Sequence, residues 1–276
     1  MLFKPIRPML LHKSNEPPEG DYIHQLKFDG FRCLLHINGN QVKLFTRHQN
    51  DCTLQFPEFS GITIKRNSAV LDGEMIVLDE SGKPDFEAVM TKFLSTKQKC
   101  KYSAHFAAFD VLQVEGRSIM SLPLEKRLEI LQDLVLVSEQ TSVVQSYADG
   151  KSLFERVTQQ GLEGIVSKKK GSSYRLDSRS RDWLKVKNDQ FAIVAISGIR
   201  KREFGWAIEL DGKHAGVCEF VPSAERAAFT RIAKQLVRSE NKNWIYLEPA
   251  IKAMVKFQSY TKSGLMRSPS FVEFIV

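Results

Sequence analysis

Lys27 has the surroundings that best suit covalent chemistry in this 276-residue chain. Residues 25–32 read Gln-Leu-Lys-Phe-Asp-Gly-Phe-Arg. The apolar Tyr22, Ile23 and Leu26 precede the lysine, a glycine permits a turn after it, and Arg32 could hold a phosphate. A lysine amine is nucleophilic only when it is unprotonated, and apolar or cationic surroundings favour that state. We therefore expect a lowered pKa at Lys27, although the Lys-x-Asp-Gly motif by itself favours a surface turn.

Two further segments place acidic and aromatic residues beside apolar runs. The Asp-Gly-Glu sequence at 72–74 lies between two such runs, and alone it indicates a hairpin turn with a solvated glutamate, Glu74. Phe109 precedes Asp110 in a strand-like segment, where packing in the core is the simpler interpretation of the ring.

Two strand-like segments carry lysines and a glutamate. Residues 163–168 read Glu-Gly-Ile-Val-Ser-Lys, and the alternation of a strand places Glu163 on the face opposite Lys168. Residues 182–187 read Asp-Trp-Leu-Lys-Val-Lys, which directs Lys185 and Lys187 to one face. Two lysines on one strand face repel each other unless an anion lies between them.

The chain carries excess positive charge, with a net charge of +8 and an isoelectric point near 9.2. Most of the excess lies in residues 168–187, where eight basic residues accompany two acidic ones. Such a run is most often a solvated surface, and contact with an anionic partner such as nucleic acid is the functional alternative.

The elements that must position these residues are helices and short strands. Helical spacing is present at 86–93 after a capping Asp85, at 124–135, and after a capping box formed by Ser152 and Glu155 that leads to a stop at Gly161. Strand-like runs are predicted at 33–37, 42–46, 70–78, 105–114, 164–168 and 183–186. Their hairpin-length connections predict an α+β fold of largely antiparallel sheets.

The pattern of predicted elements changes after Asn188. Strands are predicted at 191–199, 204–221, 244–247, 254–260 and 271–276, with a turn at Asp211-Gly212. A single helix capped by Ser223 interrupts them. This pattern favours a small barrel of the oligonucleotide-binding (OB) type, so we expect domains at 1–188 and 189–276.

In order and separation, these segments resemble the motif series of covalent nucleotidyltransferases, which are ATP-dependent DNA ligases, RNA ligases and mRNA-capping guanylyltransferases. Lys-x-Asp-Gly-x-Arg, Asp-Gly-Glu, an aromatic-Asp strand, Glu-Gly-Ile-Val-x-Lys and Trp-Leu-Lys-x-Lys all fall within residues 27–187. Residues 260–271 are similar to the barrel of bacterial DNA ligases, especially the ligase module of end-joining polymerase-ligases. The resemblance implies a compact ligase of bacterial or phage type, with an ATP-grasp-like nucleotidyltransferase domain followed by an OB-fold domain.

The resemblance assigns the nucleotide site. Lys27 would attack the α-phosphate of ATP and hold AMP through a phosphoramidate bond, while Lys185 and Lys187 contact that phosphate. Phe109 would stack on adenine, and Gln25 with the backbone near Leu26 would read its edge. Lys168 belongs to the same implied set.

The resemblance also assigns residues that would bind the metal ion and the ends of the nick. Glu163 would bind Mg²⁺ (or Mn²⁺), and Glu74 would contact the ribose or join the metal shell. Arg32 and Arg47 would hold the 5′-phosphate end or the ribose-phosphate, and Asp29 could orient the attacking 3′-hydroxyl.

By the same resemblance, the basic run would contact nicked double-stranded DNA. The residues implied are Lys168, Lys169, Lys170, Arg175, Arg179 and Arg181. Contacts to phosphates should make binding strongly dependent on salt and nearly independent of sequence.

Two departures from the pattern stand out. Gln25 occupies a position where many ligases have glutamate, and both side chains can accept a hydrogen bond from an adenine amine. No Arg-x-Asp-Lys-type motif is found at the C-terminus, so either Arg267 or another basic residue orients pyrophosphate, or self-adenylation is weak.

Three functions follow from these residues: a DNA ligase first, then an RNA ligase or guanylyltransferase, and more distantly a non-catalytic end-binding module. The sequence has no stretch that suits a membrane span or a signal peptide, and its four cysteines form no Cys-x-x-Cys pair. We expect a cytoplasmic monomer with reduced cysteines. Protein partners in repair or end joining stay open.

Overall fold

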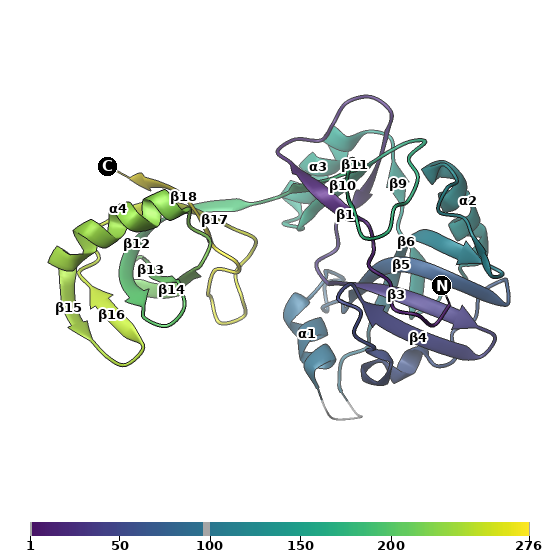
Figure 1. Ribbon diagram of the computed structural model, residues 1–276, viewed down its shortest axis with the longest axis horizontal. Coiled ribbons are helices and arrows are strands. Elements are labelled where there is room, and N and C mark those ends of the chain that lie inside the picture. The colour runs from purple at the N-terminus through teal and green to yellow at the C-terminus, as the bar shows by residue number, and fades with distance from the viewer. Residues whose placement is uncertain (1, 96–99, 276) are drawn as a thin grey trace. The chain divides into compact units, whose positions relative to one another are not determined.

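The computed structural model describes residues 2–95 and 100–275, and the chain forms two compact units, Met1–Lys187 and Asn188–Val276 (Figure 1). Val276, the last residue of the predicted strand 271–276, lies outside the described residues. Within the described ranges, no helix is both long and apolar enough to cross a membrane.

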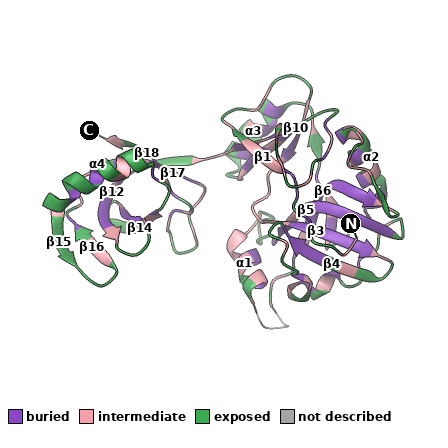
Figure 2. Ribbon diagram, viewed as in Figure 1, coloured by how far each residue is buried: buried purple, intermediate pink, exposed green. Residues whose placement is uncertain are grey.

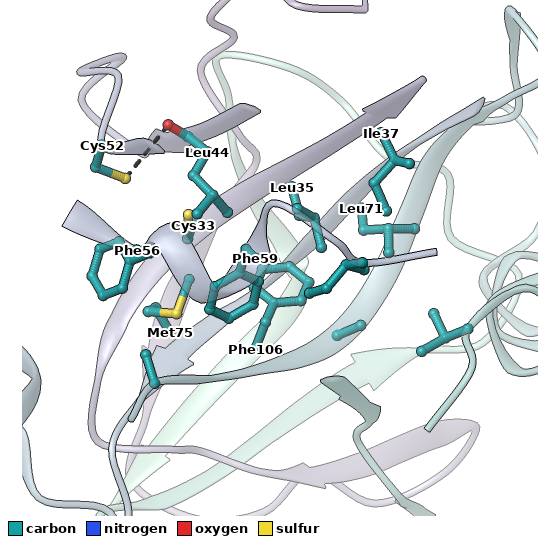
Figure 3. Close-up of a cluster of buried hydrophobic side chains, with 14 of the residues drawn as sticks. Cys33, Leu35, Ile37, Leu44, Cys52, Phe56, Phe59, Leu71, Met75 and Phe106 are labelled. Atoms are coloured by element: carbon teal, nitrogen blue, oxygen red, sulfur yellow. Dashed lines mark hydrogen bonds between the residues drawn. The ribbon is translucent and has the colours of Figure 1, made fainter. Parts of the chain in front are cut away.

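One sheet of the first unit has six strands and contributes many of its buried apolar residues. Its order is β4 (Gln41–Thr46), β3 (Phe31–Asn38), β5 (Ser68–Ile76), β6 (His105–Val114) and β7 (Arg117–Ser118), with β8 (Thr141–Val143) parallel to β6. The central strands β3, β5 and β6 are mostly buried (Figure 2). Figure 3 shows Phe59, Met75 and Phe106 in the hydrophobic cluster that covers this sheet.

Strand β5 corrects one expectation. Taken alone, the motif at 72–74 indicated a hairpin turn, whereas β5 runs through these residues without interruption, in agreement with the strand-like run predicted at 70–78. Gly73 permits this, because a Cβ at this position would lie 2.5 Å from Cζ of Phe106 and 2.7 Å from the Ala107 carbonyl oxygen. Glu74 is therefore held on a sheet and not in a solvated turn.

The second sheet of this unit carries three of the lysines singled out in the sequence, Lys168, Lys185 and Lys187. Its order is β1 (Leu10–Ser14), β11 (Arg179–Lys187), β10 (Gly164–Lys169), β2 (Tyr22–Leu26) and β9 (Ser146–Tyr147). β1 pairs with β11 in parallel, and the other pairs are antiparallel. The strand-like runs predicted at 164–168 and 183–186 correspond to β10 and β11, whereas β1 and β2 were not predicted, because their short mixed sequences lack a clear alternation.

Three helices complete the first unit: α1 (Phe86–Leu94), α2 (Leu124–Leu134) and α3 (Gly150–Gln159). Asp85 caps α1 as predicted, accepting a hydrogen bond from the amide of Ala88. The predicted capping box of α3 is wrong, because the capping residue is Asp149, three residues before Ser152, and it accepts a hydrogen bond from the Ser152 amide. Short 3₁₀ helices, η1 (Thr53–Gln55) and η2 (Pro57–Phe59), follow β4.

The second unit is a curved antiparallel sheet with one long helix. Its strands are β12 (Gln190–Arg200), β13 (Trp206–Leu210), β14 (Lys213–Cys218), β15 (Val237–Glu240), β16 (Trp244–Leu247), β17 (Lys252–Phe257) and β18 (Ser270–Ile275). The long β12 pairs with β13, β16 and β17. Hydrogen bonds from Phe271 to Phe220 and from Met266 to Ala215 bring the ends of the sheet together, as in an OB-type barrel.

The core of the second unit surrounds Trp206, whose ring contacts Phe229, Phe271 and Phe274. Helix α4 (Ser223–Ala233) continues into η3 (Lys234–Leu236). The predicted cap is wrong, because Ser223 is already helical and the capping position is Pro222, which has no side-chain hydrogen bond. The α+β class and the antiparallel sheets are as predicted.

Candidate active site

The register of three strands places several of the predicted nucleotide residues on one sheet face. Across β2, β10 and β11, Gln25 pairs with Val166, which pairs with Lys185. Side chains two positions apart share a face, so Lys27 and Lys187 extend that face by one row. The Lys27 amide donates to the carbonyl of Gly164, which is the register partner of Lys187.

The Lys27 ammonium is ion-paired with a carboxylate. Its Nζ lies 2.8 Å from Oε2 of Glu163, whose Oε1 lies 3.8 Å from Nζ of Lys187. The Glu163 side chain is 7% exposed and the Lys27 side chain 21% exposed. Glu163 directly precedes β10, so the strand alternation that placed it opposite Lys168 does not extend to it. Its carboxylate lies between Lys27, which follows β2, and Lys187 of β11.

The expected lowered pKa of Lys27 is wrong for this state of the protein. Burial acts to lower the pKa of the amine, but the carboxylates of Glu163, Glu74 and Asp29 outweigh it, and the pKa is raised. The amine is thus stored as an ammonium ion. A nucleophilic attack requires that the influence of these carboxylates be reduced.

Glu74 interacts electrostatically with both Lys27 and Glu163. Burial raises its pKa to about 8; Glu163 acts in the same direction, and Lys27 opposes both. Among the described residues, no group of three or more His, Cys, Asp or Glu side chains could hold a metal ion. Two carboxylates nonetheless fit Mg²⁺, which commonly binds through one or two carboxylates, water and substrate phosphates.

A narrow cavity of about 60 Å³ opens beside Lys27. Its walls are formed by Leu11, Gln25, Leu26, Lys27, Phe28, Arg32, Glu74, Phe109, Val166, Lys168 and Trp183. Gln25 is 1% exposed, and its Nε2 donates to Ser146 Oγ at 3.2 Å. Its Oε1 has no hydrogen-bond partner among the described residues, which leaves a buried acceptor for a ligand.

Two cations border the Phe109 ring. The guanidinium carbon of Arg32 is 5.4 Å and Nζ of Lys168 is 4.5 Å from the ring centroid. Lys168 donates to the Phe109 carbonyl and is 1% exposed, so it is part of the cavity and not of the exposed basic run. Burial lowers the pKa of Lys168 to about 7.

These motifs converge although they are far apart in the sequence, and a comparison of the chain with known proteins identifies the set. The family model of the ATP dependent DNA ligase domain matches residues 1–187. The chain belongs to the ATP-dependent DNA ligase family. The resemblance seen in its motifs is therefore confirmed, and RNA ligase and guanylyltransferase are not favoured.

Curated relatives agree with this assignment. The ligase is 41% identical over 272 residues to the SPbeta prophage-derived DNA ligase-like protein LigB of Bacillus subtilis (strain 168), covering 96% of this chain and 97% of that protein. It is 33% identical over 199 residues to the multifunctional non-homologous end joining protein LigD of Pseudomonas aeruginosa, covering 68% of this chain but only 23% of that protein.

Solved structures share the fold. The ligase domain of M. tuberculosis LigD matches with a TM-score of 0.60 at 24% identity, covering 98% of this chain and 95% of that one. A Lig E DNA ligase matches with a TM-score of 0.66 at 21% identity, covering 97% and 98% of the two chains.

A second concavity of the ligase, about 340 Å³ in volume, is predominantly basic. It is lined by Arg7, Pro8, Leu10, Leu11, Arg47, His48, Gln49, Asp177, Arg179 and Lys185. Burial together with the charges of Lys187, Lys27 and Arg179 lowers the pKa of Lys185. Such crowding of cations is the arrangement expected around an anion.

The remaining predicted residues are not among those that line these two cavities. Lys169, Lys170, Arg175 and Arg181 are exposed. Asp29 follows Lys27 in a bend, where Gly30 is required because a Cβ would lie 2.2 Å from the Met75 carbonyl oxygen. Arg267 belongs to the second unit and donates to Gln258.

Arg32 is more constrained than the sequence indicated. Its guanidinium pairs with both carboxylate oxygens of Asp72, at 2.9 and 2.6 Å, and donates to the Met9 carbonyl. Sequence reasoning missed Asp72 and Tyr174 as parts of the site. The signal for Asp72 was its Asp-Gly-Glu motif, which read as a turn, while nothing in the sequence singled out Tyr174.

Proposed function

We propose that this ligase seals 5′-phosphate/3′-hydroxyl nicks in duplex DNA through a covalent AMP on Lys27 and a DNA-adenylate. The observation that carries the proposal is the pairing of Lys27 with Glu163 on the sheet face that also bears Lys185 and Lys187. This arrangement combines a nucleophile, a carboxylate and two further cations at one point. Phosphoryl transfer depends on such positioning and charge neutralisation.

The first step joins Lys27 to AMP. The Lys27 ammonium first releases a proton to solvent, and the neutral amine attacks the α-phosphorus of ATP. A phosphorus–nitrogen bond forms, the bond to pyrophosphate breaks, and the nitrogen releases a second proton to solvent. Lys185 and Lys187 neutralise charge on the phosphate oxygens. Glu163 and Glu74 would hold Mg²⁺ (or Mn²⁺), which supplies Lewis-acid stabilisation of phosphate oxygens when bound. Engaging Glu163 elsewhere would also lower the raised pKa of Lys27.

Recognition of the base rests on the cavity residues. The unpartnered Oε1 of Gln25 suits the exocyclic amine of adenine, and Phe109 offers a ring for stacking. The main chain at Leu26 and the buried Lys168 complete this set, and Arg32 contacts the ribose-phosphate.

The later steps act on the nick. The 5′-phosphate oxygen attacks the Lys27-bound AMP and releases the lysine, and the 3′-hydroxyl, oriented by Asp29, then attacks the 5′-phosphate and releases AMP. The basic concavity with Arg47 and Arg179 suits that phosphate. Lys169, Lys170, Arg175 and Arg181 would contact neighbouring backbone phosphates. Residues 1–188 would act as the adenylation domain and 189–276 as the OB domain.

Intact-mass analysis after incubation with ATP and Mg²⁺ tests the proposal. Deadenylated wild-type protein should gain one AMP, Lys27→Ala should gain none, and GTP should not replace ATP. The wild type should then seal a nicked DNA duplex faster than the matched nick with RNA ends. An equal adduct on Lys27→Ala would remove the nucleophile assignment, and the absence of any adduct on the wild type would remove the enzymatic mechanism.

A further inference from the structure

Tyr174 is the buried centre of a hydrogen-bond network that reaches the nucleotide cavity. Its hydroxyl donates to Oδ2 of Asp72 at 2.6 Å, and it accepts from Nη2 of Arg32 and from the amide of Met9, each at 3.1 Å. One donation and two acceptances use the full capacity of a phenol hydroxyl. The side chain thereby links three segments far apart in the sequence.

The network determines how many N–H groups of Arg32 remain available to a substrate. A guanidinium has five N–H bonds. Two point to the carboxylate of Asp72, one to the Met9 carbonyl and one to Tyr174. Among the described residues, one N–H on Nη1 has no partner. Arg32 lines the cavity beside Lys27, so this donor is the one available to a nucleotide atom.

We propose that Tyr174 is a positioning residue, whose hydroxyl fixes the Arg32 guanidinium at the nucleotide cavity and so sets the rate at which Lys27 takes up AMP. The inference rests on the proposed lysyl-AMP chemistry. Without the hydroxyl, a second N–H of Arg32 and the Met9 amide lose their partners, and the guanidinium gains alternative orientations. Misplacement of a group that contacts the reacting phosphate region slows the chemical step.

The ring of Tyr174 has a separate packing role. It lies edge-on to Trp183, with centroids 5.6 Å apart, and the guanidinium carbon of Arg127 is 5.9 Å from its centroid. Tyr174→Phe retains these contacts and removes only the hydroxyl. The substitution therefore separates positioning of Arg32 from packing of the core.

The experiment is a single-turnover measurement of AMP-adduct formation over a range of ATP concentrations. Tyr174→Phe should lower the maximal rate by about tenfold and change the ATP concentration at half-maximal rate by less than about twofold. Ile37→Val serves as the control, because Ile37 is buried in the hydrophobic cluster of Figure 3, to which neither Tyr174 nor Arg32 belongs. Its truncation lowers stability without removing a bond of this network. The control should adenylate at the wild-type rate.

A double-mutant cycle identifies the route of the effect. In an Arg32→Lys background the lysine cannot make the same bonds, so adding Tyr174→Phe should slow adduct formation by less than about twofold. A full tenfold loss in that background, or a wild-type rate for Tyr174→Phe, overturns the inference.

Arg32→Lys alone, which leaves the tyrosine in place, should also slow adduct formation by at least about tenfold. A wild-type rate for this variant overturns the inference even if Tyr174→Phe fails to fold. If the wild type forms no adduct, the proposed function and this inference fall together. An active wild type with an unaffected Tyr174→Phe removes only the positioning role.

Discussion

Two ion pairs in the first unit differ in how far they are buried and in how many contacts join the two charges. Arg127 and Asp110 are both 0% exposed, and their bidentate contact has distances of 2.8 and 2.9 Å. Arg127 also donates to the carbonyls of Leu122 and Ser172. Lys27 and Glu163 share a single short contact, remain partly exposed, and have further ionisable groups nearby.

The difference separates a structural ion pair from a reactive one. In the Arg127 pair, each charge has one dominant partner and both side chains are fully buried, so neither group is available to a ligand. In the Lys27 pair, two carboxylates and two lysines compete, and the pKa values of Lys27 and Glu74 are both raised. Unbalanced charge near a cavity is typical of a catalytic site.

The largest expected effect concerns the structural pair. Arg127→Met should lower the free energy of unfolding by about 3–5 kcal/mol, because Asp110 is left as a buried charge without its partner. Urea unfolding measures this loss, and the AMP adduct per folded molecule should be unchanged. The double variant Arg127→Met/Asp110→Leu should recover much of the stability. A loss below about 1 kcal/mol for the single variant would contradict the comparison.

The reactive pair should respond in activity and not in stability. Glu163→Gln should slow nick sealing by about 100-fold through loss of metal-binding capacity, while stability changes by no more than about 1 kcal/mol. The pH optimum for adduct formation should also shift downward, since one carboxylate that raises the pKa of Lys27 is gone. Faster sealing at neutral pH would mean that Glu163 only restrains the lysine.

Glu74 should make stability depend on pH. Its pKa is 4.5 in the unfolded chain and about 8 in the folded protein, so the folded state holds a proton that the unfolded state releases. This contribution is fully present below pH 4.5 and is lost as the pH rises toward about 8. Glu74→Gln should flatten that part of the stability profile measured by urea unfolding. The exposed Glu129→Gln is the control, and identical profiles for both variants would refute the assignment.

The smallest effect is expected on the exposed basic surface. Arg181→Gln should reduce the slope of log binding constant against log salt by about 1 for nicked duplex DNA, because one phosphate contact is lost. Fluorescence anisotropy at several salt concentrations measures the slope. Lys126→Gln, whose side chain is 62% exposed and outside the basic run, should leave the slope unchanged. Equal slopes for Arg181→Gln and wild type would place Arg181 away from DNA.

Local patterns predicted much of the fold. The predicted strand 105–114 matches β6 residue for residue, and the cap of α1 is Asp85 as expected. Both depend on neighbours a few residues away. The start of α3 was wrong because Asp149 and Ser152 are both good caps and lie within one turn of each other. The start of α4 was wrong because the helix follows Pro222 and has no side-chain cap, so the polar Ser223 was a misleading signal.

The sequence by itself determined the family, the candidate nucleophile and the shared face of Lys185 and Lys187, since strand alternation needs no tertiary information. Only the tertiary structure decided the protonation of Lys27, the burial of Lys168 and the bonds that restrain Arg32. Glu163 is 136 residues from Lys27, and Tyr174 is 142 residues from Arg32. Charge interactions depend on distance through space, and the sequence does not record that distance.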